Sequence, residues 1–253
     1  MLIHASLKAL KARHRGKDRT KRKTRRTSVH VCKKGVLLVQ DELQQGPMHA
    51  DVVKDRATMR VEAVSVGRPT CAQDTIRMLE TLRMYGRLPL VFGTDNGGAY
   101  IARPVKDYLD FHMVIHLKNL KHTPQHNGGA ERAVRESKDI VDLSLADNAT
   151  DGCRQLAMRW AIRNANLPRQ SRNWETADQM DSSIEPWYLS IRRRDFFQAA
   201  QASIKLAVQP GMKQREACKA EREAIFQTLE GFGLILRTTG GAHSRPKKPE
   251  VVL

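Results

Sequence analysis

Three acidic residues stand where predicted elements begin or end, and carboxylates placed in this way can hold metal ions. Asp41 and Asp95 each end a short apolar run, and Glu131 lies in the first turns of a predicted helix. If the fold brings the three together, their mutual repulsion calls for a hard cation. Mg²⁺ or Mn²⁺ takes such oxygen ligands, and two ions can activate an attacking oxygen and stabilise a leaving one.

Turn-forming residues lie beside two of these acids. Glycine and asparagine let the backbone turn sharply, so that the carboxylate of Asp95 can face a metal ion. A proline stops the segment before the third acid, and an Asn-Gly pair permits a tight entry into the helix that carries Glu131. The residues that we expect to shape the site in this way are Asn96, Gly97, Pro124, Asn127 and Gly128.

The charge of the chain indicates a polyanionic partner. The 253 residues include 44 Lys and Arg against 27 Asp and Glu, which gives a formal net charge of +17. Binding of such a chain to DNA is favoured by the release of counterions. Residues 8–26 hold eleven Lys and Arg and one acid, so we expect an arm that grasps DNA, with a solvated linker as the alternative. The predicted DNA contacts are Arg132, Arg135 and Lys138 near the third acid, and Lys21, Arg22, Lys23, Arg25 and Arg26 in the arm.

Composition excludes several other classes of protein. The four cysteines are widely spaced and form no C-x-x-C pair, so we expect free thiols and no structural zinc site. No apolar run reaches the length of about 18 residues that a membrane span needs, and the apolar start is too short for a signal peptide. We therefore expect a cytoplasmic protein with no membrane partner.

The pattern of apolar runs predicts an α/β fold with a mixed five-stranded sheet flanked by helices. Three closely connected strands predict an antiparallel meander, and Gly46-Pro47 is a turn signal between the first two. The predicted strands are residues 36–41, 49–55, 59–66, 88–95 and 113–117. The predicted helices are residues 70–85 with Thr70 as N-cap, residues 100–111, and a helix from Asn127 to about 147.

Three regions follow from these patterns. Residues 1–34 form a basic arm or linker, and residues 35–150 form the catalytic core. Residues 151–253 are mostly helical, including an amphipathic helix over 213–229, and end in a possible hairpin and a loose tail.

Two segments resemble the catalytic core of DDE transposases and retroviral integrases. These are TDNGG at 94–98 and PQHNGGAER at 124–132, with Arg135 and Lys138 further along the helix. Thirty-five residues separate Asp95 from Glu131, as in the D-35-E arrangement of that family. The DRAT segment at 55–58 and the strand that enters TDNGG also resemble bacterial insertion-sequence transposases. The resemblance covers roughly residues 35–145, with a weaker likeness to about 190.

This resemblance implies a ribonuclease H-like fold that cleaves DNA and transfers strands with two Mg²⁺ or Mn²⁺ ions. Asp41, Asp95 and Glu131 would be the catalytic residues and the metal ligands. The partners would be transposon ends and target DNA, and the chain would act as a homo-oligomer on DNA in the bacterial cytoplasm.

The chain departs from the family pattern at the first acid. Family members usually carry a small hydroxyl residue two positions after it, whereas Leu43 stands there in this chain. Glu42 is a conceivable substitute for Asp41, and Asp51 or Asp55 could be mistaken for it. His122 and His126 could orient water or bind phosphate near the site, or could be ordinary loop residues.

The N-terminal region is a second departure. Residues 1–34 are too short and too charged to form the helix-turn-helix that reads the ends of a transposable element. One alternative is therefore a truncated, non-transposing remnant that binds DNA. Another is a ribonuclease H-like nuclease that acts on RNA–DNA hybrids.

Overall fold

The computed structural model describes residues 27–119 and 128–239, and the chain divides into two compact units. The larger unit, Val31–Ile235, contains the main sheet and the helices. In the unit formed by the two chain ends, β1 (Thr27–Val31) pairs with β7 (Ile235–Thr239). Within the described residues, the predicted C-terminal strand therefore exists, but its partner is β1 and not a neighbour in a local hairpin.

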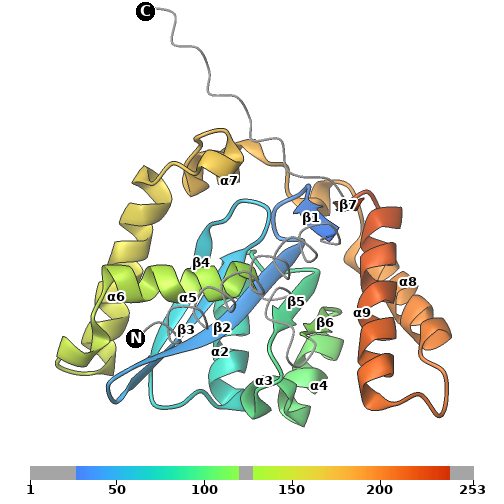
Figure 1. Cartoon of the computed structure of the whole chain (residues 1–253), viewed down its shortest axis with the longest axis horizontal. Helices are drawn as coiled ribbons and strands as arrows, with labels where there is room; N and C mark the ends of the chain where they lie inside the picture. Colours follow the sequence, from blue (N-terminus) through green and yellow to red (C-terminus); the bar gives the residue numbers. More distant parts are fainter. Residues whose placement is uncertain (1–26, 120–127, 240–253) are drawn as a thin grey trace, which may run out of the picture. The chain divides into compact units, whose positions relative to one another are not determined.

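Five strands of the larger unit form one mixed sheet in the order β4-β3-β2-β5-β6 (Figure 1). β2 (Leu37–Gln45), β3 (Met48–Asp55) and β4 (Val61–Gly67) form an antiparallel meander. β5 (Val91–Thr94) and β6 (Ile115–Lys118) continue the sheet in parallel with β2. The predicted α/β fold with a mixed five-stranded sheet is confirmed.

β2 is longer than the sequence predicted, and Asp41 lies within this strand and not at its end. The sequence predicted that the strand ends at residue 41, because the apolar run ends at Val39. Pairing with β3 nevertheless continues to Gln45 opposite Met48, because backbone hydrogen bonds do not need apolar side chains. Gly46, at φ +58°, then makes the tight turn between the two strands.

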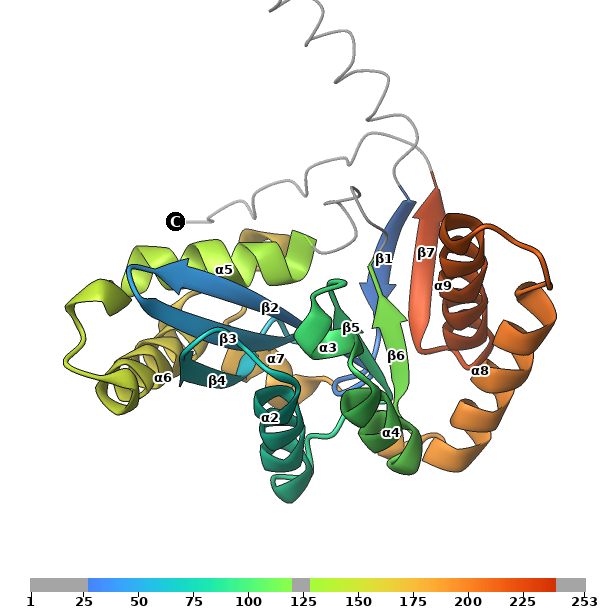
Figure 2. The ribbon, with the colours of Figure 1, turned by 90° about the horizontal axis from the view of Figure 1, so that it is seen from below.

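Helices cover both faces of the sheet (Figure 2). α5 (Gly128–Ile140) and α6 (Ala149–Asn166) pack on one face, and α2 (Ala72–Met84) and α4 (Arg103–Phe111) pack on the other. Burial on both faces explains the nearly continuous apolar runs of the central strands. The core under α5 and α6 includes Leu43, Val52, Ala133, Leu156 and Trp160. The core under α2 and α4 includes Leu38, Leu79, Phe92, Val105 and Leu109.

Two helix ends differ from the prediction. The N-cap of α2 is Cys71, because Thr70 is engaged elsewhere: its hydroxyl lies 2.5 Å from the Asp51 carboxylate. α5 ends at Ile140 and is followed by the short 3₁₀ turn Leu143–Leu145, whereas the sequence predicted a helix to about 147. Both predictions relied on local propensity, which a hydrogen bond to a distant residue or a tight turn can override.

The C-terminal part of the larger unit is helical, as predicted. It contains α7 (Ala177–Ser183), α8 (Arg193–Ala207) and α9 (Gln214–Gly231), of which α8 and α9 pack on each other. The Arg193 guanidinium donates to the backbone carbonyls of Leu88 and Pro89 at 2.8 and 2.5 Å. Arg193 therefore ties the start of α8 to the segment that leads into β5.

In the structure, no disulfide joins any of the four cysteines, which are Cys32, Cys71, Cys153 and Cys218. In the described part of the chain, no helix combines the length and the apolar character that crossing a bilayer requires.

Candidate active site

Asp41 and Asp95 come from neighbouring parallel strands. Val39 of β2 lies in register with Gly93 of β5, and each acid follows two residues further along the chain. Side chains two residues apart on a strand point to the same face. The parallel pairing of β2 with β5 thus brings the two acids to one part of the sheet, although 54 positions separate them in sequence.

α5 supplies the third acid of the predicted set. Glu131 lies in the first turn of α5 and is half-buried. Ala130 and Ala133 on either side of it are buried, and Ala133 belongs to the core that holds α5 on the sheet. The small alanine side chains let this end of α5 lie close to the strands, which positions Glu131 near β2.

The electrostatics of Asp41 show that these acids share one region. Burial raises the pKa of Asp41 to about 6, and the backbone N–H of Glu42, which donates to Asp41 Oδ1 at 3.0 Å, opposes that rise. The negative charges of Asp95, Glu131 and Asp51 raise the pKa further. Asp41 is thus the acid that interacts with both other predicted members of the site.

The donor chemistry of the three acids fits a divalent cation, but their present arrangement is not a metal-binding cluster. Among the residues that the structure describes, no three His, Cys, Asp or Glu side chains are placed to hold a metal ion together. Carboxylate oxygens are the ligands that Mg²⁺ and Mn²⁺ prefer. A cation would also relieve the repulsion that Asp95 and Glu131 exert on Asp41.

The turn after β5 holds Asp95 in place. The backbone N–H of Gly97 donates to Asp95 Oδ1 at 2.8 Å, and the Asn96 amide donates to the Asn119 carbonyl. Gly97 has φ −58°, which any residue can adopt, so the expectation that it supplies conformational freedom is wrong. The reason for a glycine is space: a Cβ there would lie 3.0 Å from Asp95 Oδ1 and 3.2 Å from Tyr100 Cδ2.

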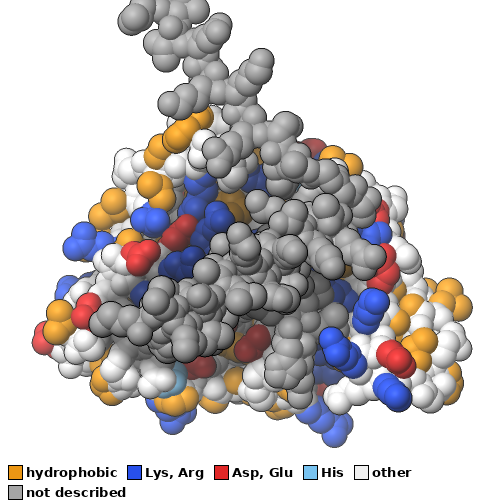
Figure 3. Space-filling model, in the orientation of Figure 1, with side chains coloured by type: hydrophobic (Ala, Val, Ile, Leu, Met, Phe, Trp, Pro, Cys, Tyr) orange, Lys and Arg blue, Asp and Glu red, His pale blue; other side chains and the backbone are white. Residues whose placement is uncertain are grey.

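The predicted DNA contacts of α5 are all available to solvent. Arg132, Arg135 and Lys138 are exposed. On the face of the molecule drawn in Figure 3, Lys and Arg side chains lie at several separate places. Gly128 begins α5, as expected for a residue that admits the chain into the helix. The remaining predicted residues lie outside the described part of the chain: Pro124, Asn127, His122 and His126, and in the basic arm Lys21, Arg22, Lys23, Arg25 and Arg26.

The alternatives to Asp41 are engaged in structural hydrogen bonds. Glu42 Oε1 accepts from the backbone N–H and the hydroxyl of Thr70 and lies 2.8 Å from His49 Nδ1. Asp51 accepts from Gln40, Thr70 and Tyr100 side chains. Asp55 is buried and accepts from the backbone N–H groups of Gly35 and Ala57, both at 2.7 Å. These bonds hold strands, helix α2 and the β3–β4 turn together.

A buried charge network on α5 was not predicted from the sequence. Lys54 of β3 is fully buried, and its Nζ lies 3.7 Å from Glu136. The Arg169 guanidinium makes two bonds of 3.2 Å to the same carboxylate, and Arg163 approaches to 3.7 Å. The network joins α5 to β3 and to the segment after α6, so it fixes the helix that carries Glu131. The available signal was a lysine that directly follows the apolar pair Val52 and Val53 in β3.

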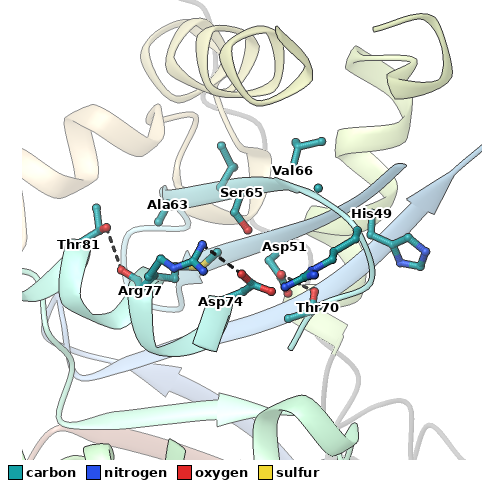
Figure 4. Close-up of a pocket in the computed structure, with 13 residues that line it drawn as sticks. His49, Asp51, Ala63, Ser65, Val66, Thr70, Asp74, Arg77 and Thr81 are labelled. Atoms are coloured by element: carbon teal, nitrogen blue, oxygen red, sulfur yellow. Dashed lines mark hydrogen bonds and ion pairs between the residues drawn. The ribbon is translucent and has the colours of Figure 1, made fainter. Parts of the chain in front are cut away.

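The cavity drawn in Figure 4 is separate from the three acids. It has a volume of about 360 Å³ and lies between β3, β4 and the start of α2. Arg77 points toward Asp74, and Thr70 toward Asp51, across its wall (Figure 4). Its lining does not include Asp41, Asp95 or Glu131, so the cavity itself is not the candidate catalytic centre.

Sequence comparison relates the chain to retroviral Pol polyproteins, while no protein-family model matches it. Over 158 residues, or 62% of the chain, it is 25% identical to the Pol polyprotein of equine infectious anemia virus (strain Wyoming). Over 52 residues, or 21% of the chain, it is 48% identical to the retrovirus-related Pol polyprotein from transposon TNT 1-94 of Nicotiana tabacum. The matched regions span only 12% and 4% of the length of these relatives.

Structure comparison relates the fold to integrases. A chain in the cryo-EM structure of the simian T-cell lymphotropic virus intasome in complex with PP2A regulatory subunit B56 gamma superposes with a TM-score of 0.54 at 17% identity, covering 63% of this chain and 59% of that one. The catalytic core domain of BIV integrase gives 0.46 at 19% identity, and that of HTLV-2 integrase, in complex with magnesium, gives 0.47 at 17%. These two alignments cover 58% of this chain and 95% and 97% of the core domains.

The sequence and fold comparisons are consistent with each other. The chain is similar in sequence to retroviral Pol polyproteins over 62% of its length, and its fold, which is ribonuclease H-like, is similar to that of a chain in a retroviral intasome.

Proposed function

We propose that this chain is a DDE transposase that cleaves DNA and transfers strands with the help of divalent metal ions. Asp41, Asp95 and Glu131 are its catalytic residues. The observation that carries the proposal is the interaction among these three acids: Asp41 lies on β2, Asp95 directly follows the adjacent parallel strand β5, and the charges of Asp95 and Glu131 both act on Asp41. Homology to Pol polyproteins supports the same reaction class.

The choice of Asp41 as the first acid rests on a comparison of its interactions with those of the alternative acids. Glu42, Asp51 and Asp55 hold segments of the fold together through their hydrogen bonds. Asp41 is coupled to both Asp95 and Glu131. The absence of a hydroxyl residue two positions after Asp41 is therefore no reason to assign the role of first acid to another residue.

Each residue has a defined role in the proposed reaction. Asp41, Asp95 and Glu131 would hold the metal ions. The bond from Gly97 N–H keeps the Asp95 carboxylate oriented, while the Glu136 network keeps α5 on the sheet. When bound, Mg²⁺ or Mn²⁺ activates the attacking oxygen and stabilises the leaving oxygen of an in-line displacement.

DNA is the proposed partner in this reaction. Arg132, Arg135 and Lys138 contact backbone phosphates from the exposed side of α5, and the basic arm adds sequence-independent affinity. Joining two DNA ends to one target requires two active sites, so the DNA-bound form is a homo-oligomer. We assign the chain to a bacterial insertion sequence and its action to the cytoplasm.

The decisive test is strand transfer of a labelled, pre-cut DNA end into a plasmid, with Mg²⁺ or Mn²⁺. We expect Asp41→Asn, Asp95→Asn and Glu131→Gln each to lower the rate by roughly three orders of magnitude, because metal ions supply several kcal/mol of charge stabilisation. DNA binding should be retained. Asp110→Asn, at an exposed position of α4, is the matched control and should be fully active.

The outcomes separate this function from its alternatives. Loss of strand transfer in all three variants, with binding retained, supports the DDE transposase. A folded wild-type protein that binds DNA and metal but transfers no strands indicates the non-transposing remnant. Cleavage of RNA–DNA hybrids in preference to DNA ends indicates a ribonuclease H-like nuclease.

A further inference from the structure

Arg56 occupies an unusual position beneath the helix that carries Glu131. It lies in the turn between β3 and β4 and is only partly accessible. Its guanidinium lies directly against the first turn of α5: a Cβ on Gly129 would be 1.6 Å from Arg56 Nη1 and 2.7 Å from Cζ. Only a glycine at position 129 leaves room for this arginine.

Among the described residues, no carboxylate forms an ion pair with the Arg56 guanidinium. Asp55 is the acid whose charge acts on it, but Asp55 accepts its bonds from the backbone N–H groups of Gly35 and Ala57. Within the described residues, no carboxylate lies within ion-pair distance of the Arg56 guanidinium, and no side-chain or backbone oxygen accepts a bond from it. A half-buried, unmatched guanidinium is costly unless an anion joins it.

Three further arginines surround Arg56. Arg172 Nη2 donates to the Arg56 backbone carbonyl at 3.2 Å, and Arg132 follows Gly129 on α5. Burial lowers the pKa of Arg56, and the charges of Arg172 and Arg132 lower it further. Burial also lowers the pKa of Arg222 to about 10, with Arg56 contributing. Arg56 is therefore repelled by three other guanidiniums.

This region borders the catalytic acids on two sides. Gly129, which touches Arg56, stands two residues before Glu131 on α5. On the other side, Arg222 Nη1 donates to Asn119 Oδ1 at 3.3 Å, and Asn119 receives a bond from the Asn96 amide. Asn96 directly follows Asp95. An anion held by Arg56 would thus lie next to the place where the acids meet.

We propose that Arg56 binds a backbone phosphate of the DNA strand that enters the active site, with Arg172, Arg132 and Arg222 completing the positive surroundings. This inference rests on the proposed function and adds a phosphate site to it. A guanidinium offers several N–H donors in a fixed plane that matches two phosphate oxygens, which lysine cannot reproduce. Binding fixes the register of the strand and does not read its sequence.

The test measures DNA binding alone, so it does not depend on catalysis. A fluorescent DNA duplex is titrated with the full chain, without divalent metal, and duplexes with one phosphate replaced by a neutral methylphosphonate are compared position by position. The variants are Arg56→Ala, Arg56→Lys and Gly129→Ala. Arg159→Ala, an exposed arginine of α6, and Gly231→Ala, whose Cβ meets open space, are the matched controls.

We expect Arg56→Ala to weaken binding by about tenfold or more, and Arg159→Ala by much less. One methylphosphonate position should weaken binding of the wild type and have no further effect on Arg56→Ala, since both changes remove the same contact. Arg56→Lys should recover only part of the affinity. Gly129→Ala should lower affinity without changing charge, because its methyl group displaces the guanidinium, whereas Gly231→Ala should not.

Thermal melting of each variant separates loss of the contact from loss of the fold. The proposal is overturned if folded Arg56→Ala and Arg159→Ala weaken binding equally, or if the losses from Arg56→Ala and from every methylphosphonate simply add. In either case DNA is still bound, and the proposed transposase function stands. If the wild type binds no DNA, both proposals fail together.

Discussion

At the scale of single residues, the proposed site depends on which carboxylate interacts with both Asp95 and Glu131. Glu42, Asp51 and Asp55 lie close to Asp41 in sequence or in space, yet each holds structural hydrogen bonds. Asp41 lies between two other negative charges, and repulsion from them adds to the effect of burial on its pKa. The structure thus gives Glu42, Asp51 and Asp55 structural roles, while the role of Asp41 as a metal ligand stays a proposal.

Gly97 offers a test of how closely Asp95 must be held. In Gly97→Ala the new methyl group would lie 3.0 Å from Asp95 Oδ1, so the carboxylate must shift. We expect strand transfer to fall by about tenfold to a hundredfold with DNA binding unchanged, because small misplacements of a catalytic group are costly. Gly98→Ala meets no atom within 4 Å and should be nearly as active as the wild type. Equal activity of the two variants would contradict this account of Gly97.

At the scale of elements, α5 holds Glu131, one of the proposed catalytic residues, against the sheet. It carries Glu131 in its first turn, leaves space for Arg56 at Gly129, and is fixed further along by Glu136. The indole N–H of Trp160, on α6, donates a hydrogen bond of 2.9 Å to the Ser137 hydroxyl. The helix is therefore positioned by buried polar contacts along one side, while its basic residues stay exposed.

The Glu136 network predicts a large effect on stability. Glu136→Gln would leave Lys54, Arg163 and Arg169 without their shared counter-charge in a buried place. We expect the free energy of unfolding to fall by about 3–5 kcal/mol, as for other buried charge clusters that lose one partner. Urea unfolding of this variant beside Glu216→Gln, at an exposed position of α9, measures the difference. A loss below about 1 kcal/mol, typical of surface ion pairs, would show that the network is not needed.

The sequence was sufficient for the sheet but not for the contacts between distant segments, and its choice of the three acids stays a prediction. Apolar runs with turn signals predicted β2 to β6 because burial on two faces requires such runs. The 35-residue spacing of Asp95 and Glu131 marked two of the acids. The pairing of β1 with β7, the role of Thr70 and the partners of Lys54 depend on residues far apart in sequence, and no local pattern encodes them.

At the scale of the whole molecule, positive charge is the main feature. The net charge is +17, and residues 8–26 carry eleven of the 44 Lys and Arg. The described helices add exposed basic residues beside Glu131. Such a distribution favours binding anywhere along DNA before a particular site is engaged, because phosphate contacts carry no sequence information.

Removal of residues 1–26 tests the contribution of the arm. A chain that lacks them should bind duplex DNA more weakly, and its affinity should fall less steeply with salt, by about one unit of logarithmic slope for each lost phosphate contact. Binding isotherms at several salt concentrations measure both quantities. The melting temperature should stay unchanged, which controls for damage to the fold. An unaltered salt slope would mean that the arm does not contact DNA.

The parallel pairing of β2 with β5 also has a consequence for the order of folding. The β2–β3–β4 meander can form from neighbouring residues, whereas β5 joins β2 only after the intervening helix α2 has been accommodated. Non-local pairings of this kind form slowly, since a long loop must close first. A chain emerging from the ribosome with only its meander formed therefore holds Asp41 without Asp95 or Glu131. If the three acids carry the proposed chemistry, DNA cleavage requires completion of the fold, and an unfinished chain would not cut the DNA around it.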